Sequence, residues 1–413
     1  MKLIVVSAFA LLAAGSASAA TTVYDFAGNY TASNPSGAFA YGTGNGGSGF
    51  TGFTNSYASC FGDASFACQS VGSNASVAAV GVNTSASPIS PGGTVSVPAG
   101  VLLTHPGNGG AGTDAVVKFT APTTGSYKLN GAFERLSTVA AGNGVNVGIF
   151  DGANPLYASS ALAGTGLAFG TQASFAAQPT IHHNAGDTLS FVVNNNGSYE
   201  YDSTGLLGTI TGTSGTARYD AFRAFGSGNP SAAVWTYATR AGATLFSAFP
   251  AGYGNCFGSA TFQCQTVGTN ASVAAVGRTT ALADQSLGTA TLPNDVLLLH
   301  PSIGVGATDA VVRFTTPVTG KYTVAGLFER LSDAAHPFGN GVNVEVYNGG
   351  TLLFSSSTLA APNPLSGYPT DQVSFNSIGL LTLNSGDVLS FVDNNNGEYS
   401  YDSTGLKAVV TYV

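Results

Sequence analysis

The sequence predicts an all-β protein made of two tandem antiparallel β-sandwich domains of jelly-roll type. Three observations support this prediction: a long internal repeat, apolar residues that alternate with period two, and frequent turns rich in Gly, Pro, Asn and Asp. No window shows the apolar stripe of an amphipathic helix. Many short strands with frequent turns, in a repeated unit of about 200 residues, are typical of a two-sheet sandwich.

The repeat consists of two copies of one module. Asp114 to Phe119 recurs as Asp309 to Phe314, and Tyr201 to Leu206 recurs as Tyr401 to Leu406. The extra residues of the second copy are expected in surface loops. We place module 1 at residues 20–213 and module 2 at residues 219–413, with a short linker at 214–218. At about 3.3 Å per residue the linker spans less than about 20 Å, so the two modules should abut.

Within a module, apolar residues alternate along several segments. From Tyr127 to Phe133 every second residue falls on one face of a predicted strand, and polar residues separate most of them. Segments 145–149, 189–193 and 322–328 show the same pattern, and the last five residues also resemble a strand. Asn196-Gly197 and Asn396-Gly397 are dipeptides typical of hairpin turns.

The composition favours a folded protein over several other classes. Of 413 residues, 44% are hydrophobic and only 8% are charged. Such a chain can bury a sizeable core, and it has too few charges for a coiled coil or for charge-driven disorder. The net charge of −8 makes nucleic acids and anionic membranes unexpected partners.

Residues 1–19 are expected to form a secretory signal peptide. Lys2 precedes an apolar run from Leu3 to Ala14, and small residues follow as far as Ala19. The run is shorter than the roughly 20 residues that a membrane span needs, and no later stretch of that length lacks polar residues. We therefore predict a secreted protein, extracellular or at the cell surface, without a membrane span.

Four cysteines form two close pairs, Cys60 with Cys68 and Cys256 with Cys264. In an exported protein this pattern predicts one disulfide bond per module. The loop-entropy model gives such a small ring about 2.5 kcal/mol, enough to hold a loop but not a whole module. A metal site is the alternative, but each module has only two cysteines and no histidine at the spacing of a zinc finger.

Several motifs shared by the copies resemble those of a known module. They are Asn34-Pro35 and Asn229-Pro230, His105-Pro106 and His300-Pro301, and the segments Val-Val-(Lys/Arg)-Phe-Thr, Gly-Asp-x-Leu-Ser-Phe-Val and Tyr-Asp-Ser-Thr-Gly-Leu. Together they resemble the tandem secreted bacterial β-sandwich modules, jelly-roll and carbohydrate-binding-like, of PEP-CTERM-type exported proteins. The first copy departs from the pattern because it has no Trp in the Asn-Pro segment, and the sorting tail is missing. The resemblance implies an extracellular, often carbohydrate-binding-like module and supplies no catalytic residues.

Glycan-binding surfaces present aromatic rings to sugar faces and polar groups to sugar hydroxyls. The candidate ring residues are Tyr41, Trp235 and Tyr237 near the Asn-Pro segments, Tyr199 and Tyr399 after the Asn-Gly turns, and His336 and Phe338 in a loop that is longer in module 2. At each aromatic position, a role in the hydrophobic core is the alternative.

A structural calcium ion is a supplementary hypothesis for the oxygen-rich segment 393–402, with Asp393 and Asp402 as candidate ligands. The spacing differs from that of an EF-hand loop, and module 1 has Val193 in place of Asp393. No other cofactor is expected.

Catalysis is not expected, because the sequence has no nucleophile elbow, zinc-binding helix or phosphate loop. We therefore predict a secreted, non-catalytic protein that binds a polysaccharide or a cell-surface glycan. An adhesive or structural protein that self-associates in a surface layer or matrix is the alternative, and a glycan-cleaving enzyme is the third hypothesis. Binding predicts affinity for a defined glycan, whereas self-association predicts oligomers without ligand.

Overall fold

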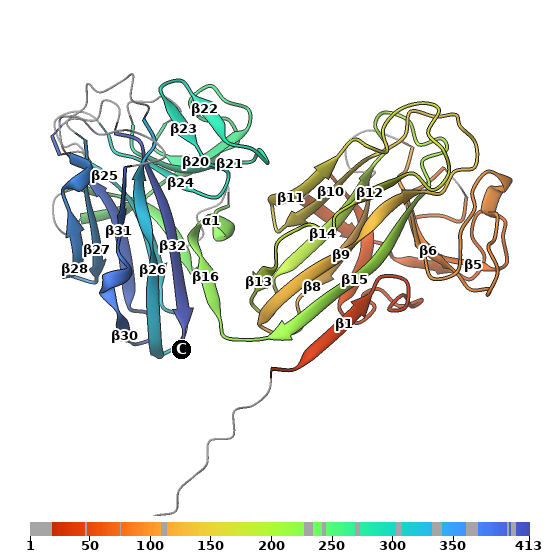
Figure 1. Cartoon of the computed structure of the whole chain (residues 1–413), viewed down its shortest axis with the longest axis horizontal. Helices are drawn as coiled ribbons and strands as arrows, with labels where there is room; N and C mark the ends of the chain where they lie inside the picture. The colour runs from red at the N-terminus through yellow and green to blue at the C-terminus, as the bar shows by residue number, and fades with distance from the viewer. Residues whose placement is uncertain are drawn as a thin grey trace, which may run out of the picture.

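The computed structural model of the chain is almost entirely strand, which confirms the predicted all-β class. It describes residues 19–45, 48–74, 76–108, 114–226, 234–241, 245–268, 273–302, 308–332, 341–360, 371–394, 396–397 and 402–413. Apart from Ala19, the predicted signal peptide lies outside these residues. Figure 1 shows two β-rich bodies, joined where β15 (Thr204–Ser214) leads into β16 (Arg218–Asp220).

Module 1 contains two antiparallel sheets, one of nine strands and one of six. The nine-stranded sheet has the order β12 (Gln172–Ser174), β9 (Gly125–Arg135), β15, β7 (Leu102–His105), β6 (Ala79–Asn83), β5 (Phe66–Ser70) and β4 (Asn55–Tyr57), with β1 (Thr21–Asp25) beside β15 and β13 (Ile181–His183) beside β9. The six-stranded sheet has the order β11 (Asn154–Ser159), β10 (Asn146–Asp151), β14 (Thr188–Asn194), β8 (Asp114–Thr120), β2 (Phe39–Asn45) and β3 (Ser48–Gly52).

Module 2 repeats this arrangement. Its nine-stranded sheet has the order β19 (Ala251–Tyr253), β20 (Phe262–Thr266), β21 (Ala275–Thr279), β24 (Leu297–His300), β32 (Thr404–Tyr412), β26 (Gly320–Arg330) and β29 (Gln372–Ser374), with β16 beside β32 and β30 (Leu380–Leu383) beside β26. Its six-stranded sheet has the order β18 (Leu245–Ala248), β17 (Trp235–Ala241), β25 (Asp309–Thr315), β31 (Val388–Asn394), β27 (Asn343–Asn348) and β28 (Thr351–Ser356). A small hairpin pairs β22 (Gln285–Leu287) with β23 (Ala290–Leu292).

Helices are few and short in the described part of the chain. They are α1 (Ala221–Ala224) and the 3-10 turns η1 (Pro91–Gly93), η2 (Thr358–Ala360) and η3 (Asn376–Ile378). None of the helices described is long and apolar enough to cross a membrane.

The main core of each module lies between its two sheets. In module 1, Leu129 and Phe133 of β9 face Phe119 of β8 and Phe191 of β14, and all four are at most 1% exposed. The matching residues of module 2 are Val324, Phe328, Phe314 and Phe391. Fully burying an apolar side chain of this size stabilises the fold by about 1.5–3 kcal/mol. The alternation predicted for residues 127–133 and 322–328 is therefore confirmed.

One glycine within β9 has a packing reason. Gly131 lies on the core face of the strand, where the ring of Phe175 covers it. An added Cβ would lie 2.1 Å from the Leu207 carbonyl oxygen of β15 and 2.7 Å from that ring, so a larger residue would collide with the neighbouring strand and with a fully buried aromatic side chain.

Both predicted disulfide bonds are present, Cys60–Cys68 and Cys256–Cys264, with Cα–Cα distances of 6.0 and 6.1 Å. Each belongs to a small second core on the outer face of the nine-stranded sheet, where Cys60 and Cys68 pack with Phe66 and Leu103. The bond ties a loop down over this face.

The two Asn-Gly turns differ from the prediction. Asn196 and Gly197 have φ values of 47° and 94°, and Asn396 and Gly397 have 49° and 91°, so the left-handed backbone typical of this dipeptide is present. The turn of module 1 nevertheless does not close a hairpin, because β14 pairs with β8 and β10 whereas β15 pairs with β1, β7 and β9. The chain crosses from one sheet to the other at this turn.

Candidate functional site

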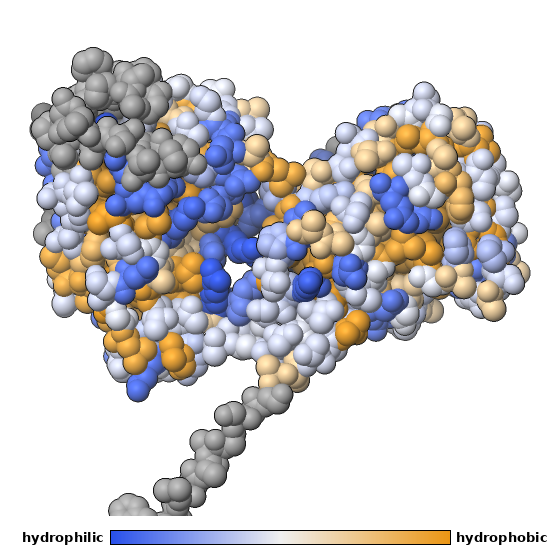
Figure 2. Space-filling view, viewed as in Figure 1, coloured by the Kyte–Doolittle hydropathy of each residue, from blue (hydrophilic) through white to orange (hydrophobic). Residues whose placement is uncertain are grey.

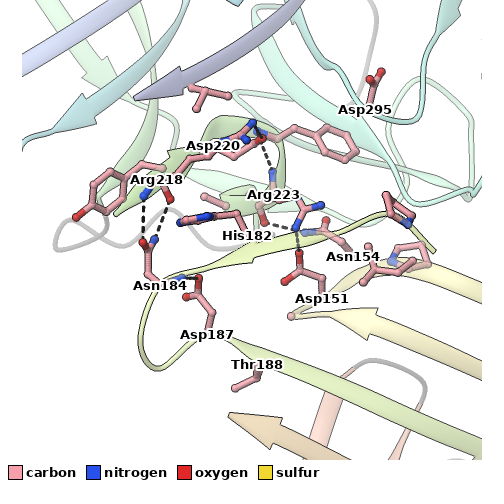
Figure 3. A pocket seen from close by; sticks show the side chains of 18 of the residues that line it. Asp151, Asn154, His182, Asn184, Asp187, Thr188, Arg218, Asp220, Arg223 and Asp295 are labelled. Atoms are coloured by element: carbon pink, nitrogen blue, oxygen red, sulfur yellow. Dashed lines mark hydrogen bonds and ion pairs between the residues drawn. The ribbon is translucent and has the colours of Figure 1, made fainter. Parts of the chain in front are cut away.

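A cleft of about 1310 Å³ lies between the two modules. Figure 2 shows hydrophilic residues gathered around this hollow. The wall from module 1 consists of the β10–β11 turn and of residues before and after β13, and the wall from module 2 consists of β16, α1 and residues near Asp295 and Lys407. Figure 3 shows the polar side chains that line it.

The cleft-facing helix α1 begins at a well-formed cap. The Oδ1 atom of Asp220 accepts hydrogen bonds from the backbone N–H groups of Phe222 (3.0 Å) and Arg223 (3.2 Å). An aspartate at this position satisfies donors that a helix leaves free at its first turn. The cap therefore fixes where α1 begins and so helps to position Phe222 and Arg223 at the cleft.

Polar contacts join the modules across the cleft. Arg223 Nη1 lies 2.9 Å from Asp151 Oδ2, and Asn154 Nδ2 donates to the Arg223 carbonyl oxygen at 2.7 Å. Asn184 pairs with the backbone of Arg218 in both directions, donating at 2.9 Å and accepting at 3.2 Å (Figure 3). The expectation that the modules abut is thus met through side chains from both.

Asp151 carries the negative charge of this contact at neutral pH. Burial raises its pKa to about 6, although Arg223 opposes the shift. Burial also lowers the pKa of His183 to about 4, so this imidazole is neutral at pH 7. The 3.7 Å approach between His183 and Asp151 is therefore not an ion pair, and Arg223 is the partner of the carboxylate.

A buried cation lies behind α1. Arg278 of β21 is fully buried, and its guanidinium carbon is 5.6 Å from the centre of the Phe222 ring. Within the described residues, none of its three guanidinium nitrogens has a hydrogen-bond partner. Burial lowers the pKa of Arg278 to about 10, so the group stays charged at neutral pH. Module 1 has Val82 at the matching position.

Three half-buried aromatic rings line the cleft: Tyr157, Tyr219 and Phe222. Tyr157 packs against Phe133 and Phe175, and Tyr219 packs against Phe314 at 5.3 Å between ring centres. The core thus holds two of these rings in place while part of each stays accessible. Rigid amphipathic rings of this kind lose little conformational entropy on binding.

Most charged side chains of the cleft are paired with one another, and the exception is Asp187, whose carboxylate accepts the backbone N–H of Asn184 at 2.7 Å. Besides Arg223 with Asp151, Lys407 Nζ lies 2.9 Å from Asp295, and Arg218 lies 3.8 Å from Asp220. Gln178, Asn184 and His182 add uncharged donors and acceptors to the lining. Such a lining matches the hydroxyl groups of an uncharged polar ligand better than it matches a strongly charged one.

Three of the predicted binding residues are core residues, and their proposed contact with a ligand was wrong. Tyr41 is fully buried, Tyr237 is 1% exposed and Trp235 is 3% exposed. Trp235 packs between Phe314 and Phe391, and although its residue borders the cleft, its ring belongs to the module 2 core. These side chains alternate along β2 and β17 on the face that points into the sandwich, which is why they are buried.

The other aromatic candidates have mixed outcomes. Tyr199 is half-buried, with its ring centre 6.3 Å from that of His105, and it does not line the cleft. Tyr399, His336 and Phe338 lie outside the described residues. Their roles stay predictions.

Asp393 and Asp402 are both buried, at 0% and 2% exposure. Burial, reinforced by the charge of Asp402, raises the pKa of Asp393. The described residues contain no group of three or more metal-ligating side chains. A calcium ion at this segment stays a prediction, since residues 395 and 398–401 are not described.

The two shared histidines, His105 and His300, end the buried strands β7 and β24. His105 Nδ1 lies 3.3 Å from the Ser203 hydroxyl, and His300 Nδ1 lies 3.4 Å from the Ser403 hydroxyl. Both imidazoles are at most 6% exposed, so these pairs tie strand ends together rather than face a cavity.

Sequence reasoning did not identify the residues of the cleft. Asp151, Asn154, Asn184 and Arg223 come from separate turns and strand ends, and no motif links them. The one local signal is Asp220, a favoured helix N-cap residue, ahead of a helix too short to show a period.

No family model and no curated protein matches the chain. Among solved structures, the tandem CBM51 modules of the family 98 glycoside hydrolase from Streptococcus pneumoniae are 11% identical, with a TM-score of 0.25 over 76% of this chain and 84% of that chain. A Paenibacillus xanthan lyase is 12% identical, with a TM-score of 0.24 over 76% of this chain and 23% of that one. The M60 catalytic domain with two CBM51 domains from Clostridium perfringens ZmpB is 9% identical, with a TM-score of 0.22 over 78% and 36%. Similarity at this level does not carry the function of those proteins over to this chain.

Proposed function

We propose that this chain is a secreted, non-catalytic protein that binds a glycan in the cleft between its modules. The observation that carries the proposal is the lining of the cleft, which combines half-buried aromatic rings with amides and internally paired charges. Rings pack on the apolar faces of sugars, and amides bond to their hydroxyls. With most of its charged side chains paired and Asp187 the one carboxylate of the described lining without a cation partner, the cleft suits an uncharged stretch of polysaccharide.

The disulfide bonds support an exported protein. Both cysteine pairs are oxidised, and such bonds persist in extracellular compartments. The signal peptide proposed for residues 1–19 and the resemblance to modules of PEP-CTERM-type exported proteins agree with this compartment. Neither of them bears on which glycan is bound.

A steric block tests the cleft without removing a core contact. Ala158 is exposed on β11 and lines the cleft, so Ala158→Trp places an indole in it. The matched control is Ser355→Trp, because Ser355 is exposed at the corresponding position of β28 and does not line the cleft. We expect the first variant to lose at least tenfold in affinity for the bound glycan and the control to bind as the unmodified protein does.

Binding is measured on a glycan array and by co-sedimentation with insoluble neutral polysaccharides. Analytical ultracentrifugation without ligand and the chain length of recovered glycan are measured in parallel. Equal binding by both tryptophan variants would refute the cleft as the site. Oligomers that form without glycan, together with no retention on any polymer, would favour the self-associating alternative. Shortened glycan would make the protein an enzyme.

A further inference from the structure

The cleft between the modules is built from parts of the two copies that do not match each other. Module 1 contributes the β10–β11 turn, β11 and the residues on either side of β13, whereas module 2 contributes β16, α1 and part of β32. Ser355 and Asp387 of module 2, which match the lining residues Ala158 and Asp187 of module 1, do not line it. Within the described residues, this cleft is therefore formed once per chain, although the module is present twice.

Aromatic rings line the cleft from both modules. Tyr157 belongs to module 1, and Tyr219 and Phe222 belong to module 2. A sugar ring has two faces, and each face can pack against an aromatic ring. A ligand between these two walls can therefore contact rings of both modules, which a ligand bound on the outside of one module cannot do.

The cleft is large enough for several sugar residues. Its volume of about 1310 Å³ exceeds the roughly 300–1,000 Å³ of a pocket that holds a drug-sized ligand. Five consecutive residues of β11, from Asn154 to Ala158, line it, and at about 3.3 Å per residue they run for about 13 Å. One sugar residue is shorter than this wall, so an oligosaccharide can make more contacts with it than a monosaccharide can.

The described surface offers no aromatic platform for the flat face of a polysaccharide crystal. Among the Phe, Tyr and Trp residues that the structure describes, Phe169 is the only exposed one, and it does not line the cleft. All the others are buried or half-buried. A flat crystal face needs several exposed rings side by side, whereas a separate chain can enter a cleft between two walls.

Polar contacts between the modules hold the two walls of the cleft together. Asn154 donates to the Arg223 carbonyl oxygen at 2.7 Å, and Asn184 donates to the Arg218 carbonyl oxygen at 2.9 Å. Arg223 also lies 2.9 Å from Asp151. A ligand that contacts both walls binds best when these contacts are made, so its binding favours the joined arrangement of the modules.

We propose that the chain has one glycan-binding site, shared by its two modules, which holds several consecutive sugar residues of a single polysaccharide chain. The inference rests on the proposed function and narrows it. One ligand is bound per chain rather than one per module, a single terminal sugar is not sufficient, and the crystal face of a polysaccharide is not the target.

The test is isothermal titration calorimetry of the full-length protein with neutral oligosaccharides of one to six residues. The probes are the β-1,4-linked series of glucose, mannose and xylose and the α-1,4-linked series of glucose. We expect at least one series to bind with one site per chain. Within that series, the affinity should rise at least about tenfold from the monosaccharide to the tetrasaccharide, about 1.4 kcal/mol of binding free energy.

A tryptophan on either wall should block the shared site. Ala158 of β11 and Ala224 of α1 are both exposed and line the cleft from module 1 and module 2, respectively. Ala158→Trp and Ala224→Trp should each lower the affinity for the tetrasaccharide at least about tenfold. The matched control is Ala248→Trp, because Ala248 is exposed at the end of β18 and does not line the cleft. A loss in only one of the two lining variants, or an equal loss in the control, would overturn the shared site.

Stabilisation by the ligand gives a second measurement that needs no variant. Trp235 fluorescence follows the unfolding of module 2, and circular dichroism follows both modules. A ligand held by both walls loses its site when either module unfolds, so the tetrasaccharide should raise the unfolding temperature of both. A shift confined to one module would contradict the inference.

The inference and the proposed function fail in different ways. Two sites per chain, a monosaccharide that binds as tightly as the tetrasaccharide, or equal retention on crystalline and amorphous cellulose would overturn the inference and leave glycan binding in place. No binding by any of the four series would overturn it as well. If, in addition, no glycan of the array and no polysaccharide retained the protein, the proposed function would fail too.

Discussion

Replacing Arg278 with methionine is expected to stabilise module 2. The guanidinium is fully buried, and none of its nitrogens has a hydrogen-bond partner within the described residues. Methionine keeps the long, flexible stem and can pack against Phe222. Replacing a buried charge by an apolar side chain of similar size is often stabilising.

The pKa of Arg278 sets the magnitude. Burial lowers it from its ordinary value in the unfolded chain to about 10, and each tenfold change in the proton equilibrium corresponds to about 1.4 kcal/mol, so the charged form costs the folded state about 3 kcal/mol. The cost is present in full below pH 10 and is relieved as the pH rises above that value, since the unfolded chain binds the proton more tightly. Loss of the cation–ring contact offsets part of the gain, so we expect about 1–3 kcal/mol more stability at pH 7.

The assay uses the only tryptophan of the chain. Trp235 lies in the core of module 2, so its fluorescence during urea unfolding reports that module and not module 1. Arg240→Met is the matched control: Arg240 is 4% exposed and paired with Asp309 and Glu345, so its removal leaves the buried Asp309 carboxylate without its cation and should cost about 3 kcal/mol. If Arg278→Met lowered the free energy of unfolding by more than about 1 kcal/mol, the inference that the buried Arg278 cation destabilises module 2 would be refuted.

Four further outcomes are expected. Burial raises the pKa of Asp202 to about 8, above its unfolded value, so folding should lose stability as the pH rises from about 4 to about 8, and Asp202→Asn should flatten that dependence in melting curves recorded by circular dichroism. Removing Cys256 and Cys264 by alanine substitution should cost about 2.5 kcal/mol in the Trp235 unfolding transition, whereas the same change at Cys60 and Cys68 should leave that transition unmoved. Trp235→Ala should cost about 3–5 kcal/mol of module 2 stability, measured by urea unfolding with circular dichroism, because the ring is core; a stable variant that had only lost glycan binding would contradict its burial. Arg223→Met should increase the radius of gyration in small-angle scattering and change the stability of each module by less than about 1 kcal/mol, since the ion pair to Asp151 is partly exposed; an unchanged radius would mean that other contacts hold the modules together.

The strands and disulfides follow from local signals in the sequence. The alternation around Leu129 depends on neighbouring residues of one strand, and each cysteine pair is close in the sequence. Both features can therefore be predicted without knowing the fold. Trp235 and Tyr237 also alternate, and their period matched that of a core-facing strand. We predicted them as ligand contacts because they are aromatic, but their alternation along the strand was the better indication that they face the core.

The cleft depends on information that no local signal carries. Asp151 and Arg223 meet because the linker and the strand β16 set how module 2 approaches module 1. The Asn-Gly turns show the same limit: their backbone conformation follows from the dipeptide, but the sheet that the next strand joins depends on distant pairing partners.

The two modules contribute different side chains to the contact between them. Module 2 contributes the Arg223 side chain, where module 1 has Gly28 at the matching position. Module 1 contributes Asp151 and Asn154, where module 2 has Asn348 and Thr351. The ion pair between Arg223 and Asp151 therefore cannot form if the order of the modules is exchanged. Two modules of nearly the same fold thus have different roles at their junction, one supplying the carboxylate and the other the guanidinium.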